Sequence, residues 1–262
     1  MSILPWDTVG ESGSTRPHRD ASGGSGPLYV VCSPNRCLGK TLLARLLAEF
    51  YVAHDRPIAA FDLADESPQL ADYLADLTTI VDLSSIRGQV AFFDRLIGEK
   101  DTAKVIDVSH RTFRDFFVIA NKIGLFEEAS RRGIEPLILF LIDPDPKSAP
   151  AYSILRRWFA DVSLMPVRNQ YVASRIPHGR AFSNESPIHV SLEIPILSVR
   201  SLVDRPPFSF VGFLQAQSTG LPARVDDELR GFLKRVFWQF CEIEFRRMCG
   251  GAGRRWSSDP FG

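Results

Sequence analysis

The sequence has no long hydrophobic run, no excess of either charge and few cysteines, and each shortage excludes a class of protein. The longest purely aliphatic or aromatic run covers residues 137–142, far short of the roughly 20 residues that span a bilayer. Its 31 basic and 31 acidic residues balance, so no overall field attracts nucleic acid or anionic lipid. Four cysteines are too few for a disulfide scaffold, and no secretory signal is visible. We therefore expect a cytoplasmic protein with reduced thiols.

The composition divides the chain into three parts. Overall, 45% apolar and 24% charged residues are typical of a globular protein that buries a core without covalent staples. Residues 1–27 differ, because five Gly, five Ser and three Pro make up almost half of them. Such a segment buries too little apolar area to offset the entropy of ordering it. We expect a flexible leader over 1–27, one folded domain over 28–250 and a flexible tail over 251–262.

From residue 28 onwards, short apolar strands alternate with amphipathic helices. The strand patterns cover residues 28–32, 57–63, 78–83, 103–109, 136–142, 162–167 and, less clearly, 186–197. Helical spacing of apolar residues predicts helices over 41–54, 85–98, 111–132, 148–160 and 222–248. This alternation predicts an α/β fold, with a mostly parallel β-sheet and helices on both faces.

Two of these helices carry a clear apolar stripe that we expect to face the core. In the helix at 85–98 the stripe consists of Val90, Phe93 and Ile97. In the helix at 222–248 it consists of Leu229, Phe232, Leu233, Val236, Phe237, Phe240 and Ile243. Charged residues fill the opposite face of the second helix, which favours core packing over membrane attachment.

The loop between the first strand and the first helix carries the most specific motif. Residues 33–41 read SPNRCLGKT and end in Gly39-Lys40-Thr41. A phosphate-binding loop has the pattern G-x-x-x-x-G-K-[ST] at this place, where N–H groups surround the phosphates, the lysine reaches them and the hydroxyl binds magnesium. Pro34 occupies the first glycine position, so only the second half of the pattern is present. The place of the tripeptide between strand and helix favours phosphate binding over an ordinary turn with a solvated lysine.

The order of the elements resembles the ParA/MinD group of deviant Walker-type P-loop ATPases. Asp62 ends the second strand, and Asp107 ends the apolar strand in AKVIDVS, as carboxylates do in that family. The resemblance implies a P-loop NTPase-like fold, ATP and Mg²⁺ as cofactors, and a homodimer formed on ATP binding. It assigns magnesium to Thr41 and Asp107, and it assigns a base contact to Asn169, which follows the strand in MPVRNQY. It implies nucleotide contacts for Asn35, Arg36, Cys37, Leu38, Gly39, Lys40, Thr41 and Leu42.

The loop departs from the family pattern K-G-G-x-G-K-[ST] in its first half. Asn35 stands where the family has a lysine that reaches the partner's nucleotide. Arg36 and Cys37 stand where the family has glycines. These departures put the partner contact and the close wrapping of the phosphates in question.

The second strand shows a further departure. The family has D-x-D here, and its second carboxylate falls on Ala64, with Asp65 one residue late. The resemblance assigns catalysis to Lys40, Asp62 and Asp65. Capping of a turn or a helix is the alternative for both carboxylates.

Two hypotheses of function follow. In the first, the chain is a ParA/MinD-like ATP- and magnesium-binding protein that acts as a nucleotide-dependent dimerising switch, with slow ATP hydrolysis. In the second, it is a degenerate, non-hydrolysing P-loop protein that serves as a scaffold for a partner protein, which the sequence does not identify. Nonspecific DNA binding through basic pairs, as in ParA-like proteins, is less favoured because the net charge is zero. A small-molecule ligase or kinase of the same superfamily is a third, less favoured interpretation.

Overall fold

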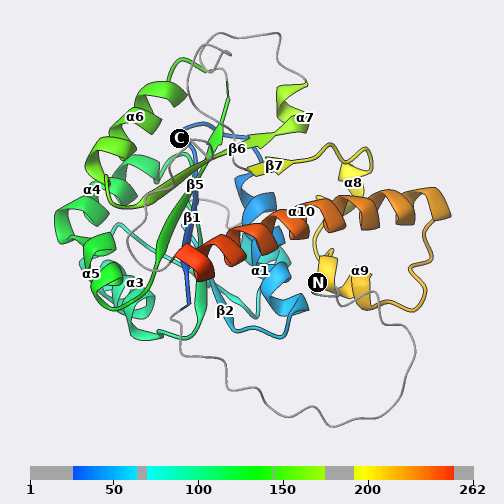
Figure 1. Ribbon diagram of the computed structural model, residues 1–262, viewed down its shortest axis with the longest axis horizontal. Coiled ribbons are helices and arrows are strands. Elements are labelled where there is room, and N and C mark those ends of the chain that lie inside the picture. The colour runs from blue at the N-terminus through cyan, green and yellow to red at the C-terminus, as the bar shows by residue number, and fades with distance from the viewer. Residues whose placement is uncertain (1–25, 64–69, 144, 175–191, 251–262) are drawn as a thin grey trace.

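A seven-stranded parallel sheet forms the centre of the molecule (Figure 1). The computed structural model describes residues 26–63, 70–143, 145–174 and 192–250. The strands lie in the order β3-β2-β4-β1-β5-β6-β7, and every pair of neighbours is parallel. The predicted α/β fold with a mostly parallel sheet is therefore confirmed.

The described strands and helices follow one another as the alternating pattern predicts. The strands are β1 (Leu28–Cys32), β2 (Ile58–Asp62), β3 (Thr78–Ile80), β4 (Ala103–Asp107), β5 (Pro136–Ile142), β6 (Ser163–Asn169) and β7 (Leu192–Ile194). The helices are α1 (Lys40–Ala53), α2 (Leu70–Tyr73), α3 (Ile86–Gly98), α4 (Phe113–Ile123), α5 (Leu125–Arg131), α6 (Ser148–Trp158), α7 (Gln170–Ala173), α8 (Arg200–Val203), α9 (Phe210–Gln215) and α10 (Ala223–Gly250). The sequence pattern did not predict the short helices α2, α7, α8 and α9.

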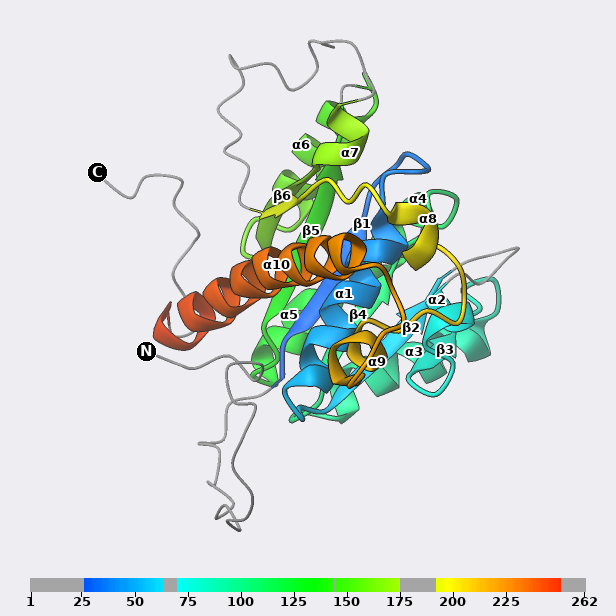
Figure 2. The same ribbon diagram turned by 90° about the vertical axis from the view of Figure 1, so that its right-hand side faces the viewer.

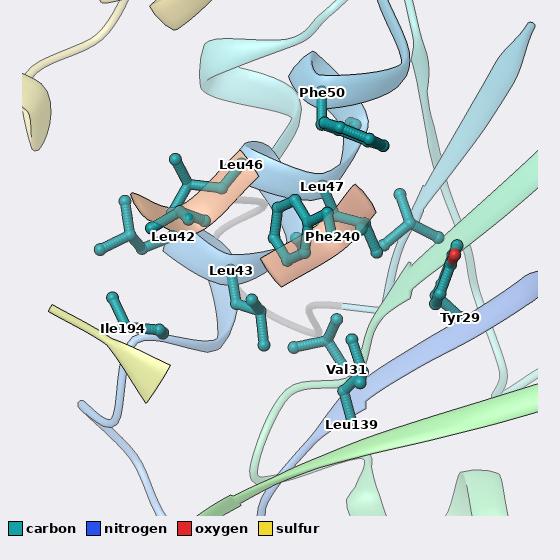
Figure 3. Packing of buried hydrophobic residues seen from close by; sticks show 14 of the residues in the cluster. Tyr29, Val31, Leu42, Leu43, Leu46, Leu47, Phe50, Leu139, Ile194 and Phe240 are labelled. Carbon is teal, nitrogen blue, oxygen red and sulfur yellow. The ribbon is translucent and has the colours of Figure 1, made fainter. Parts of the chain in front are cut away.

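Helices cover both faces of the sheet (Figures 1 and 2). Successive side chains of a strand point to opposite faces, so Tyr29 and Val31 of β1 join one apolar cluster while Val30 joins the other. Helices α1, α9 and α10 pack in the first cluster, and α3, α4, α5 and α6 pack in the second. Figure 3 shows leucines of α1 packed between sheet residues such as Val31 and Phe240 of α10. The strand that precedes the loop is thereby buried on both sides.

Two of the predicted helical features were wrong. The helix predicted over 111–132 is two helices, because Gly124 takes a left-handed conformation with φ of 63° and separates α4 from α5. On α3, Val90 is 54% exposed, whereas Phe92 and Leu96 are buried together with Phe93. The core-facing stripe of α3 is thus rotated by part of a turn from the predicted one.

The stripe predicted for the last long helix is confirmed. All seven of its members are buried against the α1 side of the sheet (Leu229, Phe232, Leu233, Val236, Phe237, Phe240 and Ile243). Across the described parts of the chain, no helix, α10 included, is both long and apolar enough to cross a membrane.

The structured body begins slightly earlier than the pattern indicates. Gly26 and Pro27, which the composition places in the leader, are buried. The carbonyl of Pro27 accepts a hydrogen bond from the N–H of Lys104 in β4. A Cβ on Gly26 would lie 2.5 Å from the backbone of Thr102, so this position fits glycine.

Helix α1 is anchored along its buried face by two charged residues. Arg45 is 1% exposed and donates to the carbonyls of Val203 and Phe208, at 2.9 Å each. Glu49 accepts hydrogen bonds from the Ser209 hydroxyl at 2.8 Å and from the N–H of Val211 at 2.9 Å. These bonds tie α1 to the segment that leads into α9. They fix the axis of the helix whose first residues are Lys40 and Thr41.

Candidate functional site

The glycine–lysine–threonine loop lies at the centre of the sheet's carboxyl edge. Strand β1 lies between β4 and β5, and residues 33–39 connect its carboxyl end to α1. The chain builds the β2–β4 half of the sheet before it crosses to β5–β7, so the strand order reverses beside β1. Ligands of open parallel α/β sheets bind at such a point. The motif therefore stands where the fold provides a ligand site.

The loop backbone contains two left-handed residues. Gly39, which precedes α1, has φ of 92°, and a Cβ there would lie 2.5 Å from Nδ2 of Asn169. Glycine is thus required at position 39 by both conformation and space. Cys37 has φ of 60°, a conformation that costs energy for a residue with a side chain. The chain keeps this loop conformation although a glycine is missing at position 37.

The side chains of the loop point to two different sides. Leu38 and Leu42 are 5% and 8% exposed and pack in the α1-side cluster, so only their backbone faces the loop. Arg36 and Cys37 are exposed. Any contact of these two leucines with a ligand of the loop would therefore involve their backbone and not their side chains.

Lys40 folds back over its own loop. It is 8% exposed, and its Nζ donates to the carbonyl oxygen of Asn35 at 2.6 Å. Burial lowers the pKa of Lys40, and the nearby Asp107 carboxylate opposes that shift. An ammonium group this deeply placed favours an anionic ligand beside it.

Thr41 and Asp107, to which the resemblance assigns magnesium, meet at the carboxyl edge of the sheet. The Thr41 hydroxyl donates to Oδ2 of Asp107 at 2.6 Å. The other oxygen, Oδ1, is buried and has no hydrogen-bond partner among the described residues. Burial raises the pKa of Asp107 to about 6; the Thr41 hydrogen bond lowers it, neighbouring Asp62 raises it and Lys40 lowers it. An unpartnered, buried carboxylate oxygen beside a hydroxyl is a donor pair suited to a hard cation.

Asp62 lies next to Asp107, because the two residues are paired in the register of β2 and β4. Its Oδ2 accepts the N–H groups of Leu70 at 2.9 Å and Ala71 at 3.3 Å, at the start of α2. The structure thus shows the capping contact that was the alternative to a catalytic role. Asp65, the other predicted catalytic carboxylate, lies outside the described residues.

Asn169 holds the loop through a hydrogen bond to its backbone. It is 4% exposed at the end of β6, where Nδ2 donates to the carbonyl of Leu38 at 3.0 Å and Oδ1 accepts from the N–H of Tyr171 at 3.1 Å. Both ends of the amide are therefore engaged within the protein. Contact with a base, as the resemblance implied, would require this amide to leave the loop.

The sequence analysis missed Asp143 and Ser148, which contact the loop from the β5–α6 turn. Asn35 donates through Nδ2 to Oδ2 of Asp143 at 2.9 Å and to the Ser148 hydroxyl at 3.1 Å. The signal was present, because Asp143 follows the strongest apolar strand of the chain just as Asp62 and Asp107 end theirs.

Sequence comparisons identify no relatives: no family model matches the chain, and no curated protein matches it either. Among solved structures, a ParA family ATPase from Chlorobium tepidum TLS is similar at 13% identity and a TM-score of 0.49, over 82% of this chain and 98% of that one. A chain of the MinC:MinD cell division protein complex from Aquifex aeolicus is similar at 12% identity and a TM-score of 0.47, over 90% of this chain and 98% of that one. A nucleotide-binding protein in complex with ADP from Archaeoglobus fulgidus is similar at 12% identity and a TM-score of 0.39, over 68% of this chain and 85% of that one.

Proposed function

We propose that loop 33–41 binds ATP together with Mg²⁺ and that the chain acts as a nucleotide-dependent switch with slow hydrolysis. One observation carries the proposal. The Lys40 ammonium and the Thr41–Asp107 pair lie together at the N-terminus of α1, on the carboxyl end of a buried central strand. Phosphate recognition needs a cation, helix N–H groups and a magnesium ligand set at one place, and these residues supply all three.

Lys40 is the phosphate ligand in this proposal. Its hydrogen bond to the carbonyl of Asn35 holds the ammonium group inside the loop. A phosphate oxygen is a stronger, charged acceptor than a carbonyl, so the ligand would replace this bond. The N–H groups of the first turn of α1 and their partial positive charge add to the attraction.

Thr41 and Asp107 would hold the cation. The residues fit magnesium because Oδ1 of Asp107 is a buried acceptor without a partner among the described residues, next to the Thr41 oxygen. No group of three or more His, Cys, Asp or Glu side chains in the described ranges could hold a metal alone. Magnesium in nucleotide sites takes the rest of its ligands from phosphates and water. When bound, it supplies neutralisation of the phosphate charge.

Slow hydrolysis follows from what the loop lacks. Pro34 has no N–H to offer a phosphate, and Arg36 and Cys37 carry side chains where close wrapping needs glycine. Asp62 is engaged at the start of α2. In this proposal Lys40 stabilises charge on the phosphates, while Asp62 and Asp65 are the candidates for placing the attacking water.

The switch would act through assembly. We propose that ATP binding promotes a homodimer that recruits a further protein. Light scattering with magnesium and a non-hydrolysable ATP analogue tests this, and a mass that stays monomeric would remove the dimer from the proposal. The second candidate, a non-hydrolysing scaffold, is favoured by the side chains at 36 and 37 and predicts nucleotide binding with no turnover at all.

Fluorescent ADP binding, measured by anisotropy with Mg²⁺ and with EDTA, tests the site. We expect saturable binding that Lys40→Ala weakens at least tenfold, about 1.4 kcal/mol. Lys122→Ala, on the exposed surface of α4, is the matched control and should bind as the wild type does. Equal affinity of wild type and Lys40→Ala would refute the phosphate-loop assignment.

A further inference from the structure

The first half of the loop is fastened to the neighbouring strand by a closed set of hydrogen bonds. Asn35 donates to Asp143 and to Ser148 through its amide, and Ser148 donates to the other oxygen of Asp143. Ser148 is fully buried, at 0% exposure. Both Asp143 oxygens and the Asn35 amide nitrogen therefore have partners. We call Asn35, Asp143 and Ser148 the Asn35 clamp.

The backbone of Asn35 connects this clamp to the phosphate ligand. Its carbonyl accepts Nζ of Lys40 at 2.6 Å, and its N–H donates to the Ser33 hydroxyl at 3.3 Å. Any shift of residue 35 would move the acceptor on which the lysine rests. Asn35 thus connects the β5–α6 turn, through its side chain, to Lys40, through its backbone carbonyl.

We propose that Asn35 and Asp143 are positioning residues that preset the phosphate loop for its ligand. The inference rests on the proposed function, because it concerns the same site. The side chain at position 35 is committed to Asp143 and Ser148 of its own chain. It is therefore unable to reach a nucleotide on another copy without breaking the clamp.

The clamp compensates for the missing glycines. Cys37, which has a side chain, carries a conformational cost at φ of 60°. A charge-assisted hydrogen bond from an amide to a carboxylate is among the stronger neutral-to-charged contacts available. Asp143 supplies it from the residue that directly follows β5.

Exchange of the two partners tests the clamp without changing its shape. Asn35→Asp places two carboxylates where the amide and Asp143 lie 2.9 Å apart, and like charges this close repel. Asp143→Asn in the same chain restores one donor and one acceptor in reversed order. Asn121→Asp, on the exposed side of α4, adds the same charge elsewhere and serves as the control.

Two readouts separate the clamp from the nucleotide proposal. Hydrogen exchange of amides 36–39 without nucleotide reports loop order, and fluorescent ADP–Mg²⁺ anisotropy reports affinity. We expect Asn35→Asp to speed the exchange and to weaken ADP binding about tenfold, and we expect the double variant to return to within a few-fold of wild type. An unaffected Asn35→Asp, or a double variant no better than the single one, overturns the clamp. The proposed function is overturned instead if the wild type binds no nucleotide while the hydrogen-exchange rates of the single and double variants still change as expected.

Discussion

Replacement of Asp107 by asparagine is expected to stabilise the ligand-free protein and to remove the proposed magnesium-dependent nucleotide binding. Asp107 is 5% exposed, and its Oδ1 has no hydrogen-bond partner among the described residues. Burial raises the pKa of this carboxyl from 3.8 to about 6. At neutral pH the carboxyl group is therefore ionised although its buried surroundings stabilise the protonated form. Asparagine keeps the acceptor for the Thr41 hydroxyl and carries no charge.

The magnitude follows from the pKa difference. Because the folded state holds this proton more tightly than the unfolded state, stability falls as pH rises from about 4 to about 6 and stays reduced above that range. The cost of the ionised Asp107 at pH 7 is about 3 kcal/mol, at 1.36 kcal/mol for each pKa unit. The asparagine amide leaves the position of Oδ1 unsatisfied, which costs about 1–3 kcal/mol. The net gain is then at most about 2 kcal/mol, or up to about 8 °C in melting temperature.

Thermal unfolding in EDTA at two pH values measures this effect. We expect Asp107→Asn to melt above wild type at pH 7, and the advantage to disappear by about pH 4.5, where the folded carboxyl is protonated. Asp94→Asn, an exposed carboxylate on α3, is the control for loss of a negative charge. A destabilised Asp107→Asn at pH 7, or a gain that does not depend on pH, would refute the reasoning.

Three further predictions concern the loop, its anchor and turnover. Gly39→Ala should lower the melting temperature by several degrees and weaken ADP binding, because Gly39 has φ of 92° and an added Cβ would lie 2.5 Å from Asn169. Gly98→Ala is the control, because an added Cβ there has nothing within 4 Å, and equal melting of the two variants would contradict the argument. Arg45→Leu should cost about 2–4 kcal/mol, since the carbonyls of Val203 and Phe208 lose their donors; chemical denaturation measures it, and a cost under about 0.5 kcal/mol would contradict it. Basal ATP turnover with Mg²⁺ should stay below about 1 per second in a phosphate-release assay, and faster turnover without a partner would show that the loop departures matter little.

The sequence predicted the elements that depend on local patterns. Strand β1 and helix α1 follow from a short apolar run and from leucines at helical spacing. The placement of Thr41 beside Asp107 was implied by the family resemblance, which assigned magnesium to both residues, and not by a local pattern.

Contacts between residues far apart in the chain could not be predicted from the sequence. Asn35 and Asp143 are 108 positions apart, and many polar residues could have met that amide. The break at Gly124 was missed because an isolated glycine inside a helical pattern does not by itself end a helix. Asn169 was expected to contact a base. Instead its amide occupies the space beside Gly39 that a side chain would fill, and it donates to the carbonyl of Leu38.

Hydrogen exchange of the wild-type chain with and without saturating ATP and Mg²⁺ tests the central claim most directly, because it reports where the ligand binds as well as whether it binds. We expect new protection in the loop and the first turn of α1, residues 33–43, with a smaller effect at the end of β4. Protection that is absent, or that appears away from this edge of the sheet, would contradict a nucleotide site at Lys40.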